Sequence, residues 1–348
     1  TIAIPKLEEM QRDGEDGRKK IAAITRYVTV ALALIQSTAM AVAFGRQGYL
    51  VQFNALSVIS AIATLTAGSA FLMWVGERIT ENGIGNGISI VLVINIISRL
   101  PEDLGNLFQQ FVFGKAPATA VLAVVIIFAV IVAMVVMVII LNDGVRRIPV
   151  QYANKVQGRK MVGGQTSNIP LKVNTAGVIP VIFAGSFIST PQTILMAFQQ
   201  NHGGDSWYQI MTTIFNMQSG PGIALYVFLI VVFTFFYAFV QVNPEKLAEN
   251  LQKQGSYISG VRPGKGTQDY ISSLLMRLST VGSLFLGLIS LIPLIASNVW
   301  NLSQSIGLGG TSLLIIVQIA LDVVRQLNGL TMKREYIGFI REPKGGND

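Results

Sequence analysis

The chain has 348 residues, of which 51% are hydrophobic and only 13% are Asp, Glu, Lys or Arg. Soluble proteins carry roughly 25% of such charged residues, so this chain has too few to coat the two or three soluble domains that its length would allow. The lack of Cys and the single His202 exclude thiolate and multi-His metal sites, and we expect neither a metal nor another cofactor.

Long segments with few charges follow one another along the chain. In chain order they are 21–44, 54–75, 87–100, 118–141, 174–197, 222–241, 274–297 and 309–328. Four of them contain no charged residue, three carry charges only near one end, and 87–100 is shorter and carries only Arg99. A helix of roughly 20 residues crosses the hydrocarbon layer of a membrane. We therefore predict an all-α polytopic membrane protein with eight spans, because eight buried helices in a soluble protein would leave too little polar surface.

The basic residues predict the orientation of these spans, because Lys and Arg favour cytoplasmic flanks. With residues 1–20 placed inside, all of the 26 Lys and Arg except Arg46, Arg99 and Lys115 fall in cytoplasmic flanks. Both ends of the chain are then cytoplasmic. The cytoplasmic segments include 1–20, 142–173, 242–273 and the tail 329–348, and the outer loops include 198–221 and 298–308. The chain begins in a polar segment without Met or a signal peptide, which we interpret as a piece of a longer protein.

Charges within the spans are almost absent. Asp322 is the only acidic residue within a predicted span; it lies near the cytoplasmic end, and Arg325 is placed to pair with it on the same helix face. A membrane enzyme or an ion-coupled transporter would need ionisable groups deeper in the membrane. The composition therefore favours a passive pathway without catalytic residues, and a secondary transporter of small molecules is the alternative.

Proline and glycine mark positions where the chain can bend. Pro180 and Pro293 fall inside predicted spans, where they can bend a helix. Gly83, Gly85 and Gly87 precede the short span 87–100, and their spacing does not match a nucleotide-binding motif. We expect a flexible turn there.

Two of the cytoplasmic loops are too structured to be plain connections. Residues 142–173 hold six basic residues and one acid, and the runs 148–152 and 169–173 predict a pair of strands projecting from the membrane. In 242–273 we predict a helix over Pro244 to Gln254, then a tight turn over 260–265. Basic projecting loops bind RNA, anionic lipid or an acidic protein face, although they can also serve only to fix the topology.

Five groups of residues stand out along the chain: 14–20 with 25–27; 76–80 with 83–89; 146–153, 169–174 and 176–180; 260–264; and 309–315. In the same order, they resemble motifs of the SecY family, whose members form the channel of the bacterial protein translocase. The resemblance implies a channel of two pseudo-symmetric helical halves with ten helices, of which eight are present here. The family's first helix, plug segment and second helix are absent. We assign 21–141 to the rest of the first half and 174–328 to the second.

The resemblance also implies roles for individual residues. A pore ring is implied for Ile88, Leu92, Ile182 and Ile315. A lateral gate is implied for Gln36, Ile179, Pro180 and Phe183. Docking of the SecA ATPase and the ribosome is implied for Arg262, Arg146, Arg147, Lys155, Arg159 and Lys160.

The implied activity is protein transport rather than catalysis. Unfolded secretory precursors with their signal peptides would cross the bacterial plasma membrane, and apolar segments would leave sideways into lipid. SecA or the ribosome would supply the energy. SecE-like and SecG-like subunits and a bilayer with anionic lipids are the further partners that the resemblance implies.

Overall fold

Eight long helices make up most of the structure, which is a computed structural model that describes residues 7, 9–10, 14–50, 52–114, 116–152, 155–157, 160–162, 166–300 and 310–338. The long helices are α2 (Gly14–Arg46), α3 (Ala55–Asn82), α4 (Gly87–Phe111), α5 (Pro117–Asp143), α6 (Ile179–His202), α8 (Gly220–Gln241), α10 (Lys265–Trp300) and α11 (Gly310–Gly338). Two short helices, α7 (Ser206–Ile214) and α9 (Pro244–Lys253), lie between them. Each of the eight predicted spans therefore corresponds to a long helix.

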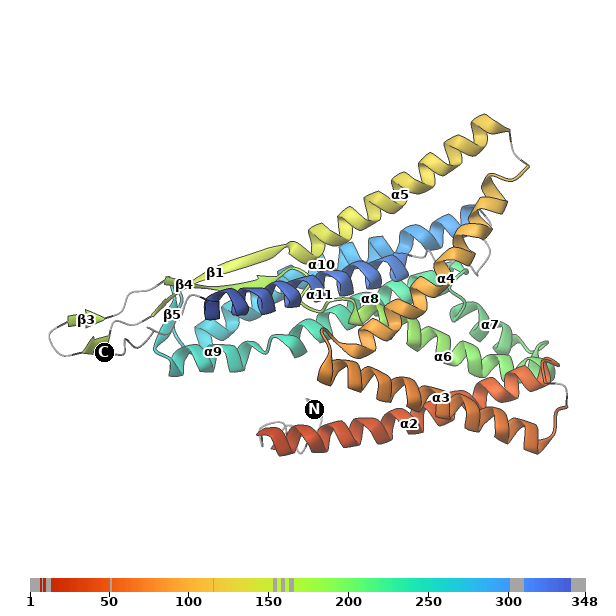
Figure 1. Ribbon diagram of the computed structural model, residues 1–348, viewed down its shortest axis with the longest axis horizontal. Helices are drawn as coiled ribbons and strands as arrows, with labels where there is room; N and C mark the ends of the chain where they lie inside the picture. Colours follow the sequence, from red (N-terminus) through yellow and green to blue (C-terminus); the bar gives the residue numbers. More distant parts are fainter. Residues whose placement is uncertain are drawn as a thin grey trace, which may run out of the picture.

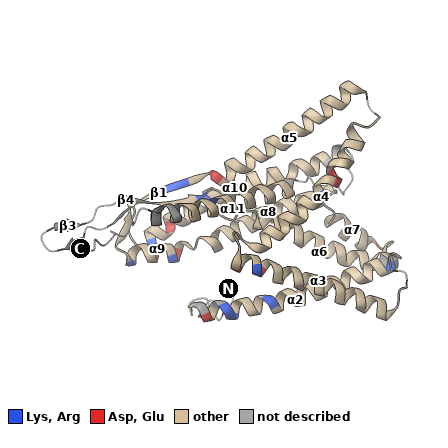
Figure 2. Ribbon diagram, in the orientation of Figure 1, with Lys and Arg blue, Asp and Glu red and all other residues tan. Residues whose placement is uncertain are grey.

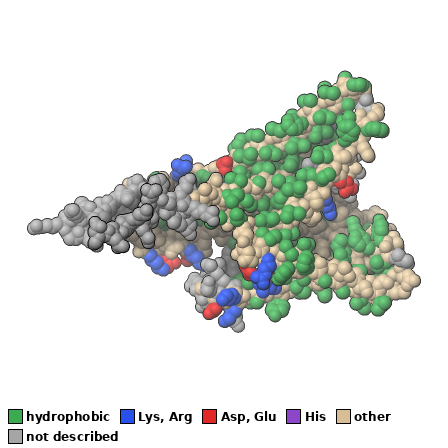
Figure 3. Space-filling model, in the orientation of Figure 1, with side chains coloured by type: hydrophobic (Ala, Val, Ile, Leu, Met, Phe, Trp, Pro, Cys, Tyr) green, Lys and Arg blue, Asp and Glu red, His purple; other side chains and the backbone are tan. Residues whose placement is uncertain are grey.

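Within the described residues, 7 helical segments are long and apolar enough to cross a membrane. Helix α4, which contains the shortest predicted span, is the long helix outside that set. It continues past Pro101 to Phe111, and every 18-residue stretch of it includes Arg99, Glu102 and Asp103. Figure 2 shows few charged residues along the helices, and on the face drawn in Figure 3 apolar side chains cover much of the helical part. Such a surface is stable in lipid, where apolar groups need no burial within the protein.

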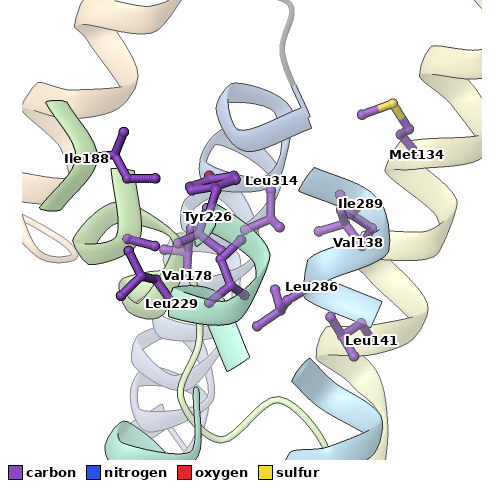
Figure 4. Close-up of a cluster of buried hydrophobic side chains, with 13 residues drawn as sticks. Met134, Val138, Leu141, Val178, Ile188, Tyr226, Leu229, Leu286, Ile289 and Leu314 are labelled. Atoms are coloured by element: carbon purple, nitrogen blue, oxygen red, sulfur yellow. The ribbon is translucent and has the colours of Figure 1, made fainter. Parts of the chain in front are cut away.

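The helices run roughly along the long axis of the molecule, with the strands at one end (Figure 1). Helix α2 packs between α3 and α6, while α8 packs between α6 and α10. The main core contains buried residues of α5, α6, α8, α10 and α11, joined by Val178 just before α6. In Figure 4, Val138 of α5 lies beside Ile289 of α10. The division expected from the sequence grouped 118–141 with the earlier spans, whereas this core packs α5 with the later helices.

The strands form at the end of the bundle where α5 and α8 finish. They are β1 (Val145–Tyr152), β2 (Lys155–Gln157), β3 (Lys160–Val162), β4 (Thr166–Lys172) and β5 (Ser256–Ile258). Strand β1 pairs antiparallel with β4 in the register Ile148↔Ile169 and with β5 in the register Gln151↔Tyr257. We call the three-stranded sheet β4-β1-β5 the projecting sheet. The predicted strand pair is thus confirmed, and β5 adds a third strand from the second loop.

The projecting sheet is attached to the helical bundle through its own small core. Ile148, Val150, Leu171 and Ile258 of the sheet pack with Leu251 of α9, and Ile271 and Leu275 of α10 complete the cluster. Residues 148 and 150 share one face of β1 because strand side chains alternate. The predicted helix over 244–254 corresponds to α9, and Asn243 caps it by accepting from the backbone N–H groups of Glu245 and Lys246. The projecting sheet, α9 and the start of α10 therefore form one packed unit.

The turn between α3 and α4 is closely packed. A Cβ at Gly87 would overlap the carbonyl oxygen of Gly76, so the two helices meet through bare backbone. Thr80 connects them, because its hydroxyl donates to Gly76 O and accepts from Gly87 N. Gly85 adopts φ 85°, a conformation that side chains disfavour. We expected a flexible turn from the glycines; their close packing gives them a structural role instead.

A polar cluster joins α11 to the base of the projecting sheet. Asn174 Nδ2 donates to Asn142 Oδ1 at 3.1 Å, and both side chains are buried. Arg325 of α11 donates to the carbonyl oxygen of Asn142 and to the carboxylate of Asp143. The expected pair with Asp322 is looser, at 3.8 Å from Arg325 Nη1. Because Asp143 precedes β1, the cluster connects the last helix to the strands.

Replacing Gly87 with Ala should lower the free energy of unfolding by about 1–3 kcal/mol, because a methyl group forces α3 and α4 apart. Gly105→Ala on the same helix is the matched control, since a Cβ there meets no atom within 4 Å. Thermal unfolding of the purified protein in detergent measures both. Equal loss of stability in the two variants would contradict the proposed close approach.

Replacing Asn142 or Asn174 with Ala should each cost about 1–3 kcal/mol, because each change leaves a buried amide without its partner. The double variant should cost less than the two single changes combined, since both partners are then removed together. The exposed Asn82→Ala serves as the control and should change stability little. Additive losses in the double variant would show that the two amides act independently.

Candidate pore, gate and docking surface

The projecting sheet brings the two basic loops onto one rigid support. Arg146 and Arg147 are exposed neighbours on β1, so their side chains leave opposite faces of the strand. The pairing of β1 with β5 places the chain that follows Ile258 beside them. The structure thus brings together loops that are more than ninety residues apart along the chain, and this proximity depends on β5.

Arg262 lies in the tight turn between β5 and α10, with an exposed side chain and a fixed backbone. Gly260 and Gly264 take positive φ angles of 82° and 86° on either side of it. The hydroxyl of Thr267 donates to the Arg262 carbonyl at 3.0 Å, and Val261 packs against the core of the sheet. The guanidinium group is therefore presented to solvent from a turn that the sheet holds in place.

The other predicted docking residues lie beyond β1. Lys155 is on β2 and Lys160 is on β3, which pair with each other as a separate two-stranded sheet. Arg159 lies outside the described residues. Lys155 and Lys160 are therefore placed on a hairpin that extends from the projecting sheet.

Two of the predicted pore residues border the main core. Ile182 of α6 and Ile315 of α11 both pack against the buried cluster that contains Val181 and Leu314. In Figure 4, Leu314 lies beside Tyr226 of α8. Two uncharged branched side chains of separate helices therefore belong to the border of one apolar core.

The other two predicted pore residues are on α4. Ile88 is 54% exposed, and Leu92, one turn later, is half-buried. Helix α4 packs against α11, which carries Ile315, and against α3 through the contact of Ile88 with Gly76. The start of α4 therefore lies beside Ile319 and Val323 of α11, about one and two turns from Ile315.

The predicted gate residues lie on α2 and α6, which pack against each other. Gln36 is half-buried on α2, while Ile179 and Phe183 are exposed near the start of α6. The ring of Phe183 lies 5.4 Å from that of Tyr237 and 6.0 Å from that of Phe233. These aromatic contacts hold the start of α6 against α8.

Pro180 differs from the expectation that it bends a span. Helix α6 begins at Ile179, so Pro180 occupies the first turn, where a backbone N–H has no helical partner. It therefore starts the helix without kinking it. The proline inside α6 is Pro191, and Pro293 lies inside α10 as predicted.

A contact that the sequence did not reveal joins α2 to α6 at the end opposite the strands. Arg46, the last residue of α2, donates from its guanidinium group to the carbonyl oxygen of Ala197 in α6. Near the other end of α2, Arg26 pairs with Glu77 of α3 at 2.8 Å. The only sign of the first contact in the sequence is that Arg46 is one of the few cations in the predicted outer loops.

The described residues do not contain a group of acidic, His or Cys side chains that could hold a metal ion. No group of three or more His, Cys, Asp or Glu side chains lies together there. Asp322 lines a pocket of about 90 Å³ between α11 and the turn before α4, together with Asn86 and Gln326. That pocket is at the strand end of α11, near the Arg325–Asp143 pair.

Comparison with known proteins identifies the family of the chain. The family model SecY matches residues 1–324. Protein translocase subunit SecY 1 of Lactobacillus kefiranofaciens is 48% identical over 344 residues, which are 97% of this chain and 79% of that protein. Protein translocase subunit SecY of Bacillus subtilis is 46% identical over 348 residues, again 97% of this chain and 79% of the relative.

Solved structures share the fold. A structure described as a protein-conducting channel has a TM-score of 0.63 at 18% identity and covers 94% of this chain and 77% of its own. Sec61 in a canine ribosome-channel complex from the endoplasmic reticulum has a TM-score of 0.57 at 15% identity, with 94% and 76% covered. Together with the family match over most of the sequence, these findings show that the chain belongs to the SecY family.

Proposed function

We propose that this chain forms most of a protein-conducting channel that moves unfolded secretory proteins across the bacterial plasma membrane. The observation that carries the proposal is the match of nearly the whole chain to proteins named as SecY subunits of the protein translocase. The proposed mechanism is passive: the channel supplies the path, and SecA or the ribosome supplies the energy. The comparisons give no support to the alternative, a transporter of small molecules.

The pore ring would consist of Ile88, Leu92, Ile182 and Ile315. The packing of both Ile182 and Ile315 against the main apolar core supports this assignment. Branched aliphatic side chains carry no charge and can close around a passing chain of any sequence. A narrow apolar constriction also excludes water, which keeps ions from leaking through an idle channel.

Lateral release would take place between α2 and α6. Apolar segments favour lipid by roughly 0.3–0.6 kcal/mol for each Leu, Ile, Phe or Val, so a gate needs only to open for them to leave. Gln36, Ile179, Pro180 and Phe183 would line the opening. The Arg46–Ala197 contact supports an opening that starts at the strand end, because it holds the opposite ends of the two helices together.

The projecting sheet and its turn would form the cytoplasmic docking surface for SecA or the ribosome. Arg146, Arg147 and Arg262 are exposed on one rigid unit, which supports recognition of an acidic partner. Lys155 and Lys160 on the hairpin would extend the surface, and the family resemblance adds Arg159 to the proposed docking residues. Both ends of the chain would lie on this cytoplasmic side, where the basic residues also favour anionic lipid. SecE-like and SecG-like subunits are the membrane partners that we propose.

Arg262→Glu should abolish SecA-driven transport while the protein stays folded. At an effective dielectric constant of about 20, a charge pair about 4 Å apart contributes roughly 4 kcal/mol, so reversal should weaken docking at least about tenfold. The assay uses full-length protein in vesicles with a SecE-type subunit, SecA and ATP, and measures protection of a secretory precursor from protease. Lys253→Glu on α9 is the control of equal charge change. Normal transport by the Arg262 variant would remove the proposed role of the turn.

Ile182→Ser combined with Ile315→Ser should make the idle channel leak ions, because two hydroxyl groups let water enter the constriction. Single-channel conductance in planar bilayers measures the leak without any transported protein. Val125→Ser, on an exposed face of α5, is the control and should leave conductance unchanged. An idle double variant as tight as the parent protein would contradict the ring assignment.

A further inference from the structure

Helix α7 is a short helix at the end of the bundle opposite the strands (Figure 1). It contacts α6 and α8, and both of these helices belong to segments long and apolar enough to cross a membrane. Segment 198–221, which contains α7, has no Lys or Arg, and Asp205 is its one acidic residue. Helix α7 therefore lies at the depth in the membrane where α6 ends and α8 begins.

The nine residues of α7 divide into three faces at the spacing of about 100° per residue. Tyr208 points toward the protein: it is 7% exposed, and its hydroxyl donates to the Leu195 carbonyl of α6 at 3.2 Å. Burial raises the pKa of this phenol above its ordinary value. The polar residues Ser206, Gln209 and Thr213 are exposed on another side.

The third face is apolar, yet it does not face the core of the protein. Trp207, Ile210 and Met211 are 48%, 57% and 43% exposed, and the i, i+3, i+4 spacing places them in one stripe. We call these three residues the apolar stripe. Trp207 suits the boundary between lipid and water. Its indole N–H donates to Asp205 Oδ2 at 3.2 Å, while about half of the side chain stays exposed. Nearby on α6, Ile194, Met196 and Phe198 are exposed as well.

We propose that α7 lies in the membrane–water interface, with the apolar stripe inserted among the lipid acyl chains beside α6 and α8. Three observations support lipid as the occupant: the depth set by the two spans, the exposed apolar residues of α6 at the same end, and the Trp with its polar edge bonded. Amphipathic helices with Trp on the apolar side bind membranes in this way. Since the helix has no cation, its insertion should not depend on anionic lipid.

The insertion would anchor the end of the gate helix α6. The hydroxyl of Tyr208 binds α7 to the carbonyl of Leu195 in α6. Ala197, whose carbonyl accepts from Arg46, is two residues further along the same helix. Lipid on one side and α2 on the other therefore restrain the same turn of α6. This inference goes beyond the proposed transport activity, because it concerns a lipid-binding surface that needs neither a precursor nor a motor.

Tryptophan fluorescence tests the proposal in the full-length protein reconstituted into phosphatidylcholine vesicles. Trp74→Phe and Trp300→Phe leave Trp207 as the one Trp of these 348 residues, since the sequence has 3 Trp, and any others in the full-length protein are likewise replaced by Phe. The matched control adds Trp207→Phe and Gln209→Trp, which moves the probe to the polar face of the same helix. Lipids brominated near the headgroup or near the chain ends, and acrylamide in the water, serve as quenchers.

Trp207 should show a blue-shifted emission and a loss of fluorescence that is larger with bromine near the headgroup than with bromine near the chain ends. The probe at position 209 should lose less fluorescence to the brominated lipids and more to acrylamide. Adding anionic phosphatidylglycerol should change neither result. Equal lipid quenching of the two probes would overturn the proposal. Shielding of Trp207 from both lipid and acrylamide would also overturn it, because a protein segment would then cover the stripe.

A second pair of variants tests the other two residues of the stripe. Ile210→Ser with Met211→Ser should reduce lipid quenching of Trp207, because the helix loses apolar area that holds it in the membrane. Gln209→Ser with Thr213→Ser is the control on the polar face and should leave the quenching unchanged. Unaltered quenching in the first pair would show that Ile210 and Met211 do not enter lipid. Precursor transport by the same vesicles, measured separately, reports on the proposed channel activity alone.

Discussion

In hydrocarbon, every backbone N–H and C=O group must find a partner within the protein, and the arrangement of the described residues follows from that requirement. Helices meet it within a single segment, so the apolar stretches become helices whose outer surface stays apolar. Strands need a second segment, and here they gather at one end of the bundle, beyond the apolar parts of the helices. The same end carries the exposed cations of β1 and of the turn before α10. One physical constraint thus separates the conducting part of the molecule from its proposed docking surface.

Much of this separation could be predicted from the sequence, because absence of charge over some twenty residues is a strong local signal. The boundaries were less predictable: α10 begins at Lys265 rather than near 274, since a polar extension continues the helix outside the apolar stretch. Strand β5 has only three residues, and its pairing depends on β1, a partner far away in the chain. Helix α7 was missed because it is short: its nine residues make only about two and a half turns, so its amphipathic spacing repeats too few times to distinguish it from a loop. The contact of Arg46 with a backbone carbonyl depends on where α6 ends in space, which local sequence does not specify.

For the candidate site, too, some features could be predicted from the sequence and others could not. Residues such as Ile182 and Ile315 look like ordinary core side chains, and only the family resemblance identified them as pore candidates; the structure then showed that both pack against one cluster. Pro180 was placed in the correct helix, but its position in the first turn gives it a different physical role from an interior proline. For Phe183, the aromatic contacts with α8 could not be predicted, because they depend on how two separate helices pack.

The bond between Arg325 and Asp143 has a mechanical consequence. Helix α11 is a stiff rod that carries Arg325 at the base of the projecting sheet and Ile315 about 15 Å away along its axis, at the main core. On the proposed assignments, a partner bound to the projecting sheet acts close to Asp143, and the rod connects Asp143 with the proposed pore residue Ile315. Helix α11 would then be a mechanical link between the proposed docking surface and the proposed pore.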